Sequence, residues 1–124
     1  MSGIGEEHLP AARAILEPAI AYANDEIRWD EVAAGVREGK YQLWMGVDSA
    51  IVTEIVKYPR HATILFTFAG GNMRELRAMM PVIEEWGKSV GAKNAGMVGR
   101  KGWERSFLTE DGWKATRVLM EKEL

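Results

Sequence analysis

The chain has 124 residues, of which 47% are hydrophobic and 27% are charged, and its formal net charge is -2. This length and composition predict one folded, soluble domain over residues 1–124. No apolar run approaches the roughly 18 residues of a membrane span, which excludes a transmembrane protein. The slightly acidic balance argues against general nucleic-acid binding. With no cysteine and two isolated histidines, the sequence offers neither a disulfide framework nor an evident metal site.

Two amphipathic helices are predicted near the N-terminus. The first spans residues 8–27 and contains Pro18, which should kink or divide it because proline cannot donate a helical hydrogen bond. The second spans residues 30–37, with Asp30 as its N-cap and Gly39 just beyond its end. Helices of this length are marginal in water, so we expect both to pack on a sheet.

Three strands are predicted next, over residues 41–47, 51–58 and 62–68. They are rich in β-branched and aromatic residues and their connections are short, which is typical of an antiparallel meander. Alternation along the third strand places Phe66 and Phe68 on one face and the residues between them on the other. Because both faces are then largely apolar, we expect this strand to be covered on both sides.

A long helix and a parallel strand follow. The helix spans residues 72–90, with Asn72 as its N-cap. Its apolar residues recur at helical spacing, and we expect Trp86 among them to be buried against the sheet. Residues 92–98 should form a strand parallel to the third one, because a helix connects the two. A short helix over residues 102–110 and a last strand over residues 113–121 complete the order ααβββαβαβ. The sequence therefore predicts an α/β (α+β) fold with a mixed sheet and helices on both faces.

The segment Gly70-Gly71-Asn72 connects the third strand to the long helix and is the first candidate binding site. Unpaired amides and the positive end of the helix dipole suit a phosphate at such a junction, and glycines allow a close approach. Paired glycines are also what a sharp strand-to-helix turn requires. On local sequence alone, this purely structural interpretation is favoured.

Two further candidates lie elsewhere in the chain. Arg100 belongs to a basic segment that could hold an anion, with Trp103 as a stacking surface; the simpler alternative is a solvated helix start that Trp103 anchors to the sheet. Glu54 is the only carboxylate inside an otherwise apolar strand and is a candidate general base with a raised pKa. An exposed carboxylate on the rim of the sheet is the commoner explanation for Glu54.

Over about residues 41–124 the sequence resembles the GNAT acetyltransferases, and in particular the short GNAT-like proteins of phage and prophage gene sets. The segments that carry this resemblance are Thr53-Glu54-Ile55-Val56-Lys57-Tyr58-Pro59-Arg60, Gly70-Gly71, Pro81-Val82-Ile83-Glu84-Glu85-Trp86-Gly87-Lys88, Gly91-Ala92, Gly99-Arg100-Lys101-Gly102-Trp103-Glu104-Arg105 and Gly112-Trp113. The resemblance implies a GNAT-like mixed sheet and acetyl-CoA as the cofactor. It implies that Gly70, Gly71 and Asn72 bind the cofactor, with Arg100 and Trp103 beside them.

The sequence departs from the GNAT pattern in three places. The motif Q/R-x-x-G-x-G/A, which holds the coenzyme A pyrophosphate in GNAT enzymes, is replaced by AGGNMR at residues 69–74. Leu108 stands where these enzymes often have a tyrosine acid. No convincing strand precedes the leading helices. The resemblance to the fold survives these departures, whereas the expectation of catalytic activity is weakened.

Two functions therefore stay open. We favour a phage or prophage protein with a degenerate acetyl-CoA site and a structural, assembly or protein-binding role in the virion or the host cytoplasm. Its expected partner is a phage head or tail component or a second copy of the chain. The alternative is an active acyl-CoA-dependent N-acetyltransferase in which Glu54 is the base.

Overall fold

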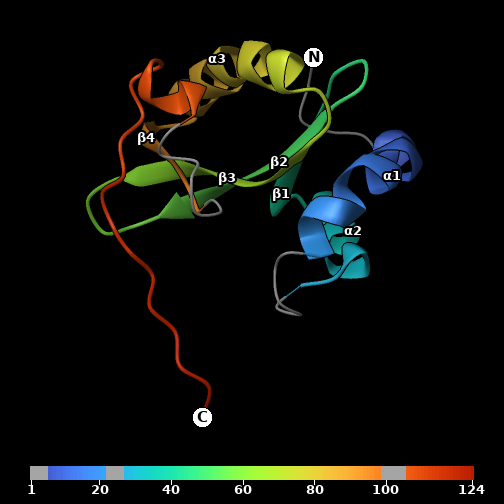
Figure 1. Cartoon of the computed structure of the whole chain (residues 1–124), viewed down its shortest axis with the longest axis horizontal. Coiled ribbons are helices and arrows are strands. Elements are labelled where there is room, and N and C mark those ends of the chain that lie inside the picture. Colours follow the sequence, from blue (N-terminus) through green and yellow to red (C-terminus); the bar gives the residue numbers. More distant parts are fainter. Residues whose placement is uncertain (1–5, 22–26, 99–105) are drawn as a thin grey trace.

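The computed structural model describes residues 6–21, 27–98 and 106–124. Its elements are η1 (Glu6–His8), α1 (Leu9–Ile20), α2 (Trp29–Glu38), β1 (Tyr41–Met45), β2 (Ala50–Lys57), β3 (Ala62–Gly70), α3 (Met73–Ser89), β4 (Ala92–Met97) and η4 (Phe107–Thr109). The strands form one sheet in the order β1-β2-β3-β4, antiparallel except for the parallel pair β3 and β4. The helices α1 and α2 cover one face of the sheet and α3 covers the other (Figure 1). The predicted mixed sheet with helices on both faces is confirmed.

Each face of the sheet has its own hydrophobic core. Beneath α1 and α2 the core contains Leu16, Val32 and Leu43, all with no exposed surface. Beneath α3 it contains Trp44, Ile64 and Ile83, which are at most 2% exposed. Burial of this kind stabilises a fold by roughly 1.5–3 kcal/mol for each fully enclosed large side chain. The two cores together explain why these short helices are stable only on the sheet.

A β-bulge changes the facing of residues along β3. Val52 pairs with Phe68 and Thr53 pairs with Phe66, so Thr67 is an extra residue with no counterpart in β2. An extra residue reverses the alternation of side chains beyond it. Phe66 consequently packs in the core beneath α3, and Phe68 packs against the core beneath α1 and α2. The prediction that both phenylalanines share one face was wrong for this reason.

The helix boundaries differ in part from the predicted ones. The first helix ends at Ile20, and part of the predicted remainder lies outside the described residues. The N-cap of α2 is Arg28 rather than Asp30, because the helix begins at Trp29, one residue before the predicted start. The backbone N–H of Arg28 donates to the Glu31 carboxylate at 3.0 Å. Gly39 ends α2 with a φ of 82°, as predicted. Asn72 caps α3, also as predicted, by accepting a hydrogen bond from the amide of Glu75.

The C-terminal residues are arranged differently from the prediction. Part of the predicted helix over residues 102–110 is outside the described residues, and the described part contains only the short turn η4. Trp113 is half-buried and packs edge-on against Phe66, with 5.8 Å between the ring centroids. Residues 114–124 are exposed throughout and form no strand, so the predicted strand over residues 113–121 was wrong. We call residues 114–124 the C-terminal arm; it leaves the body of the domain (Figure 1).

Candidate functional site

The strands β3 and β4 separate just before the strand-to-helix turn. They pair only from Ala62 with Ala92 to Phe66 with Met97. Beyond this point residues 68–70 of β3 pair with β2, and no described strand pairs with their edge on the side of β4. The bulge at Thr67 lies where the two strands part. An open strand edge that leads into a helix N-terminus offers backbone groups to an extended ligand.

Two amides at the strand-to-helix turn are already bonded by side chains of the protein. The N–H of Asn72 donates to the hydroxyl oxygen of Ser49 at 2.9 Å, and the Ser49 hydroxyl approaches the carbonyl of Asn72 at 3.4 Å. The N–H of Glu75 donates to the side-chain oxygen of Asn72 at 3.0 Å. The N–H of Leu76 donates to the Asn72 carbonyl at 2.9 Å. The amides of Asn72 and Glu75 at the helix N-terminus therefore have side-chain partners, whereas the Leu76 bond is the first regular hydrogen bond of α3.

A carboxylate from the first turn of α3 lies beside the same helix end. Glu75 extends from the first turn of α3 to the turn between β1 and β2, where its two oxygens accept the backbone N–H groups of Val47 at 2.6 Å and Asp48 at 2.9 Å. Its pKa is lowered, first by a hydrogen bond with Ser49 and then by the bonds with these two amides. The carboxylate is therefore ionised at neutral pH and places a negative charge at the positive end of the helix dipole.

The glycines of the turn allow close packing on both sides. A Cβ atom on Gly71 would lie 2.6 Å from Cα of Ser49 and would also meet the carbonyl of Asp48. A Cβ atom on Gly70 would lie 2.7 Å from the carbonyl oxygen of Ile15 in α1. These neighbouring atoms belong to the backbone, so they cannot move away from an added Cβ atom as the end of a flexible side chain could. These contacts support the structural interpretation of the glycine pair.

The Glu75 contacts lead to a testable dependence on pH. A lowered folded-state pKa means that the stabilisation is complete above the ordinary value of 4.5 and is lost as the pH falls through the lowered value. We expect Glu75→Gln to reduce the free energy of unfolding by a constant amount between about pH 7 and 5.5, and the difference from the wild type to shrink below about pH 4.5. Urea unfolding across this range measures both effects. The control is Glu85→Gln, at an exposed ion pair with Lys88 on the same helix; the same pH profile in both variants would contradict the assignment.

The structure separates the other predicted site residues from the turn. Glu54 is half-buried in β2, where it pairs with Tyr41 and Leu65. It is four residues along β2 from Ala50, the partner of Gly70, and thus roughly 13 Å from the turn at ~3.3 Å per residue. Arg100 and Trp103 lie outside the described residues, so the structure does not place them. Among the described residues, no cluster of three or more potential metal ligands is present.

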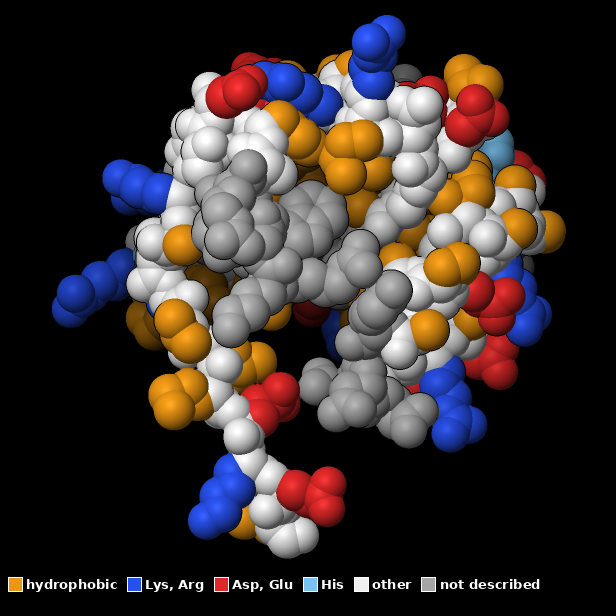
Figure 2. Space-filling model, viewed as in Figure 1, with side chains coloured by type: hydrophobic (Ala, Val, Ile, Leu, Met, Phe, Trp, Pro, Cys, Tyr) orange, Lys and Arg blue, Asp and Glu red, His pale blue; other side chains and the backbone are white. Residues whose placement is uncertain are grey.

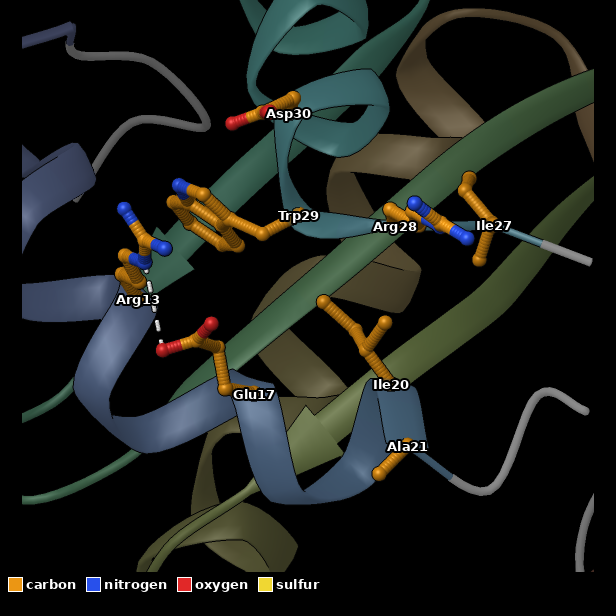
Figure 3. Close-up of a pocket in the computed structure, with 8 residues that line it drawn as sticks. All are labelled: Arg13, Glu17, Ile20, Ala21, Ile27, Arg28, Trp29 and Asp30. Carbon is orange, nitrogen blue, oxygen red and sulfur yellow. Dashed lines mark ion pairs between the residues drawn. The ribbon is translucent and has the colours of Figure 1, made fainter. Parts of the chain in front are cut away.

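A hollow of about 350 Å³ between α1 and α2 was not predicted from the sequence. Its lining residues are Arg13, Glu17, Ile20, Ala21, Ile27, Arg28, Trp29 and Asp30 (Figure 3). Arg13 and Glu17 form an ion pair at 3.2 Å on the wall of α1. The four-residue spacing of Arg13 and Glu17 is the only sign of this hollow in the sequence, and such ion pairs are common on exposed helices. The remaining polar groups of the hollow converge only when α2 docks beside α1.

Comparisons with known proteins agree on the fold. No protein-family model matches the chain, and no curated protein sequence matches it. Among solved structures, the BH1408 protein from Bacillus halodurans matches with a TM-score of 0.72 and 12% identity, over 100% of this chain and 98% of that one. An aminoglycoside N-acetyltransferase in complex with CoA matches with a TM-score of 0.66 and 11% identity, over 97% of this chain and 91% of that one.

An aminoglycoside acetyltransferase from an uncultured soil metagenomic sample, in complex with sisomicin, matches with a TM-score of 0.68 and 6% identity. The match covers 98% of this chain and 93% of that one. None of the described helices is both long enough and apolar enough to span a membrane. Nearly the whole of each related structure is matched, so the likeness extends beyond one shared motif. The chain thus has the fold of the GNAT acetyltransferases.

Proposed function

We propose that this chain is a GNAT-fold protein with a degenerate acetyl-CoA site, and that its role is to bind another protein. The observation that carries the proposal is the occupied helix N-terminus. Ser49 and Asn72 bond two of the amides that a pyrophosphate would need, and the Glu75 carboxylate lies beside them. A diphosphate at this turn would have to break these bonds and would face a negative charge. The residues present therefore do not fit the pyrophosphate of coenzyme A.

A second observation concerns the position of the missing tyrosine acid. Leu108 occupies it and is 4% exposed, packed in the core beneath α3. An aliphatic side chain cannot donate a proton to a leaving thiolate, and its burial gives it a packing role. A fold shared with acetyltransferases does not fix activity, because function depends on the site.

One observation favours the alternative function, an acyl-CoA-dependent N-acetyltransferase. The edge of β3 over residues 67–70, with which no described strand pairs on the side of β4, could pair with an extended ligand such as the amide-containing arm of a coenzyme. In that function the turn would have to open before the phosphates could bind, and Glu54 would be the candidate base. The partner in the favoured function is a phage head or tail component or a second copy of the chain, in the virion or the host cytoplasm, as the sequence resemblance implies.

Acetyl-CoA binding distinguishes the two functions. We expect no heat in calorimetry and no rise in melting temperature at millimolar acetyl-CoA. A ligand at 100 times its dissociation constant would add about 2.7 kcal/mol to the free energy of unfolding, which such a melting experiment detects. A micromolar dissociation constant for the wild type would contradict the degenerate site and favour the acetyltransferase.

Two variants test whether the Glu75 carboxylate prevents acetyl-CoA from binding at the turn. Glu75→Gln removes the charge at the helix end, whereas the control Glu85→Gln removes an exposed charge elsewhere on α3. If the carboxylate blocks the site, acetyl-CoA should bind more tightly to Glu75→Gln than to Glu85→Gln. Equal behaviour of the two variants would mean that the charge is not what closes the turn.

A further inference from the structure

We propose that a hollow between α3 and the residues that follow η4 receives a lysine side chain of a partner protein. This inference rests on the proposed role in protein binding and names the chemistry by which the partner is recognised. The hollow has a volume of about 300 Å³, and its lining residues are Arg77, Met80, Pro81, Glu84, Asp111 and Trp113. It is separate from the strand-to-helix turn, because Glu84 lies 12 residues beyond Asn72, roughly 18 Å along a helix.

The wall of the hollow that faces α3 is fixed by contacts within the chain. The Arg77 guanidinium bonds both carboxylate oxygens of Asp111, at 2.7 and 2.9 Å, and also bonds Glu110 at 3.2 Å. The N–H of Trp113 donates to the carbonyl of the buried Leu108 at 2.9 Å, and the indole ring packs on the sheet. The hollow therefore exists before a partner binds, which lowers the cost of ordering on association.

The hollow is accessible from outside the domain. The side chains of Arg77 and Asp111 on its rim are 43% and 35% exposed. η4 and the residues after it lie beside α3 at one end of the sheet (Figure 1). The C-terminal arm begins at residue 114 and extends away from the body (Figure 2), and no residue of the arm lines the hollow. A side chain of another protein can therefore reach it.

The carboxylate of Glu84 lacks a partner in the hollow. Among the described residues, none donates a hydrogen bond to Glu84 or forms an ion pair with it, whereas Asp111 is bonded by Arg77. Lys88 lies one turn further along α3, but its ammonium pairs with Glu85 at 3.6 Å. Burial raises the pKa of Glu84 and the charge of Asp111 raises it further, while the charge of Lys88 lowers it. A cation in the hollow would favour the ionised carboxylate.

Pro81 leaves a second acceptor on the same side of α3. Proline has no N–H, so the carbonyl oxygen of Arg77, four residues earlier, does not receive the regular helical hydrogen bond. Arg77, Pro81 and Glu84 follow one another at spacings of four and three residues, which places them on one side of the helix. An ammonium group has three N–H donors and can bond both this carbonyl and the Glu84 carboxylate.

The rest of the lining suits the stem of a lysine side chain. Met80, Pro81 and the indole ring of Trp113 are apolar, and lysine combines a stem of four methylene groups with a charged end. The two acceptors, a carboxylate and a backbone carbonyl, are separate groups. They fit the diverging donors of an ammonium better than the planar fork of a guanidinium, which bonds best to both oxygens of one carboxylate.

The charge around the hollow also favours a cationic partner. One positive and three negative side chains give a local net charge of -2: Arg77, Glu84, Glu110 and Asp111. A second copy of the chain is a poor source of the lysine. A lysine elsewhere on the same surface would make a head-to-tail contact, and such contacts continue into rings or open filaments. The occupant is therefore a different protein that presents an exposed lysine.

Peptide titration tests this assignment. The probes are a capped Ala-Ala-Lys-Ala-Ala peptide and the same peptide with norleucine in place of lysine, which has no ammonium. In an NMR titration of the full chain, only the lysine peptide should shift the side-chain signals of Arg77 and Trp113. Glu84→Gln should weaken its binding about five-fold, the upper end for a partly exposed ion pair. The control Glu85→Gln, an exposed carboxylate one residue later, should not. Equal binding of the two peptides, or equal effects of the two substitutions, would overturn the proposal.

Stability provides a second readout. The Glu84 carboxylate loses hydration without gaining a partner, so Glu84→Gln should melt at the same or a higher temperature than the wild type. Weaker binding by this variant then reports on the hollow and not on unfolding. A lower melting temperature would show a structural role for the carboxylate and would count against the proposal. So would self-association of the wild type that Glu84→Gln abolishes, because the occupant would then be a second copy.

Failure of this inference is distinguishable from failure of the proposed function. A micromolar dissociation constant for acetyl-CoA contradicts the proposed function and leaves the peptide result to be judged by itself, because the turn and the hollow are separate. If neither acetyl-CoA nor the lysine peptide binds, the degenerate site stands and the lysine-binding hollow is refuted.

Discussion

Trp44→Ala should lower the free energy of unfolding by about 4 kcal/mol, near the middle of the range for enclosed aromatic side chains. Trp44 is 2% exposed in the core beneath α3. Its indole N–H donates to the hydroxyl oxygen of Thr53 at 3.0 Å, and its ring meets Trp86 edge-on at 5.4 Å. The loss includes the cavity, the hydrogen bond and the aromatic contact. Equilibrium unfolding in urea, followed by circular dichroism, measures it.

Trp86→Ala is the matched comparison, because it removes the other ring of the same pair. Trp86 is only partly buried, which corrects the sequence-based view that it is the enclosed tryptophan of this core. We therefore expect a smaller loss, about 2 kcal/mol. Trp44→Phe retains most of the apolar volume and isolates the hydrogen bond to Thr53. Equal losses in the two alanine variants would contradict the burial that separates them.

Gly71→Ala is expected to cost about 3 kcal/mol, an unusually large effect for a single added methyl group. The φ of Gly71 is 113°, which costs a residue with a side chain about 1–3 kcal/mol. In addition, the new Cβ would lie 2.6 Å from Cα of Ser49 and would meet the Asp48 carbonyl. Backbone atoms on that side cannot rotate away, so the turn between β1 and β2 must move. Thermal unfolding should show a correspondingly lower melting temperature.

Gly91→Ala separates backbone strain from the clash. Gly91 has a φ of 97° and no atom within 4 Å of the Cβ position, so only the strain remains, about 1 kcal/mol. If both variants lost the same stability, close packing at Gly71 would be disproved. The same close packing makes a bulky residue at Gly71 a poor probe of ligand binding, because the substitution would destabilise the fold as well as change the site.

Most of the architecture is predictable because its signals are local. The capping residue Asn72, the helical spacing that follows it and the β-branched runs each act within a few residues. The bulge at Thr67 is not visible in this way, since alternation alone would keep Phe66 and Phe68 together. The prediction of a last strand over residues 113–121 was wrong for a related reason. β-propensity states which segments can form a strand, whereas a strand also requires an edge with which to pair.

The strand-to-helix turn is predictable from the sequence, but the residues that occupy it are not. The glycines and the cap indicate the turn, as the structure shows. The residues that occupy the turn come from elsewhere: Ser49 is 23 residues from Asn72, and Val47 is 28 residues from Glu75. No spacing rule connects such positions, because they meet only when the β1–β2 turn docks on α3. Ser49 gives a weak hint, since a serine in a turn often bonds a backbone amide.

The extra residue in β3 also bears on how the chain can change in length. Loops such as residues 58–61 can gain or lose a residue at little cost, because nothing beyond them must change its face. Deletion of Thr67 would restore regular alternation and leave Phe68 and Ala69 on their present sides of the sheet, because Phe66 and Phe68 already pair with the adjacent residues Thr53 and Val52. The two cores therefore fix the facing of the residues on either side of Thr67, but not the number of residues between Ile64 and Gly70. In a gene that diverges by insertion and deletion, this strand can therefore lose the residue at position 67 without any exchange of side chains between the two cores.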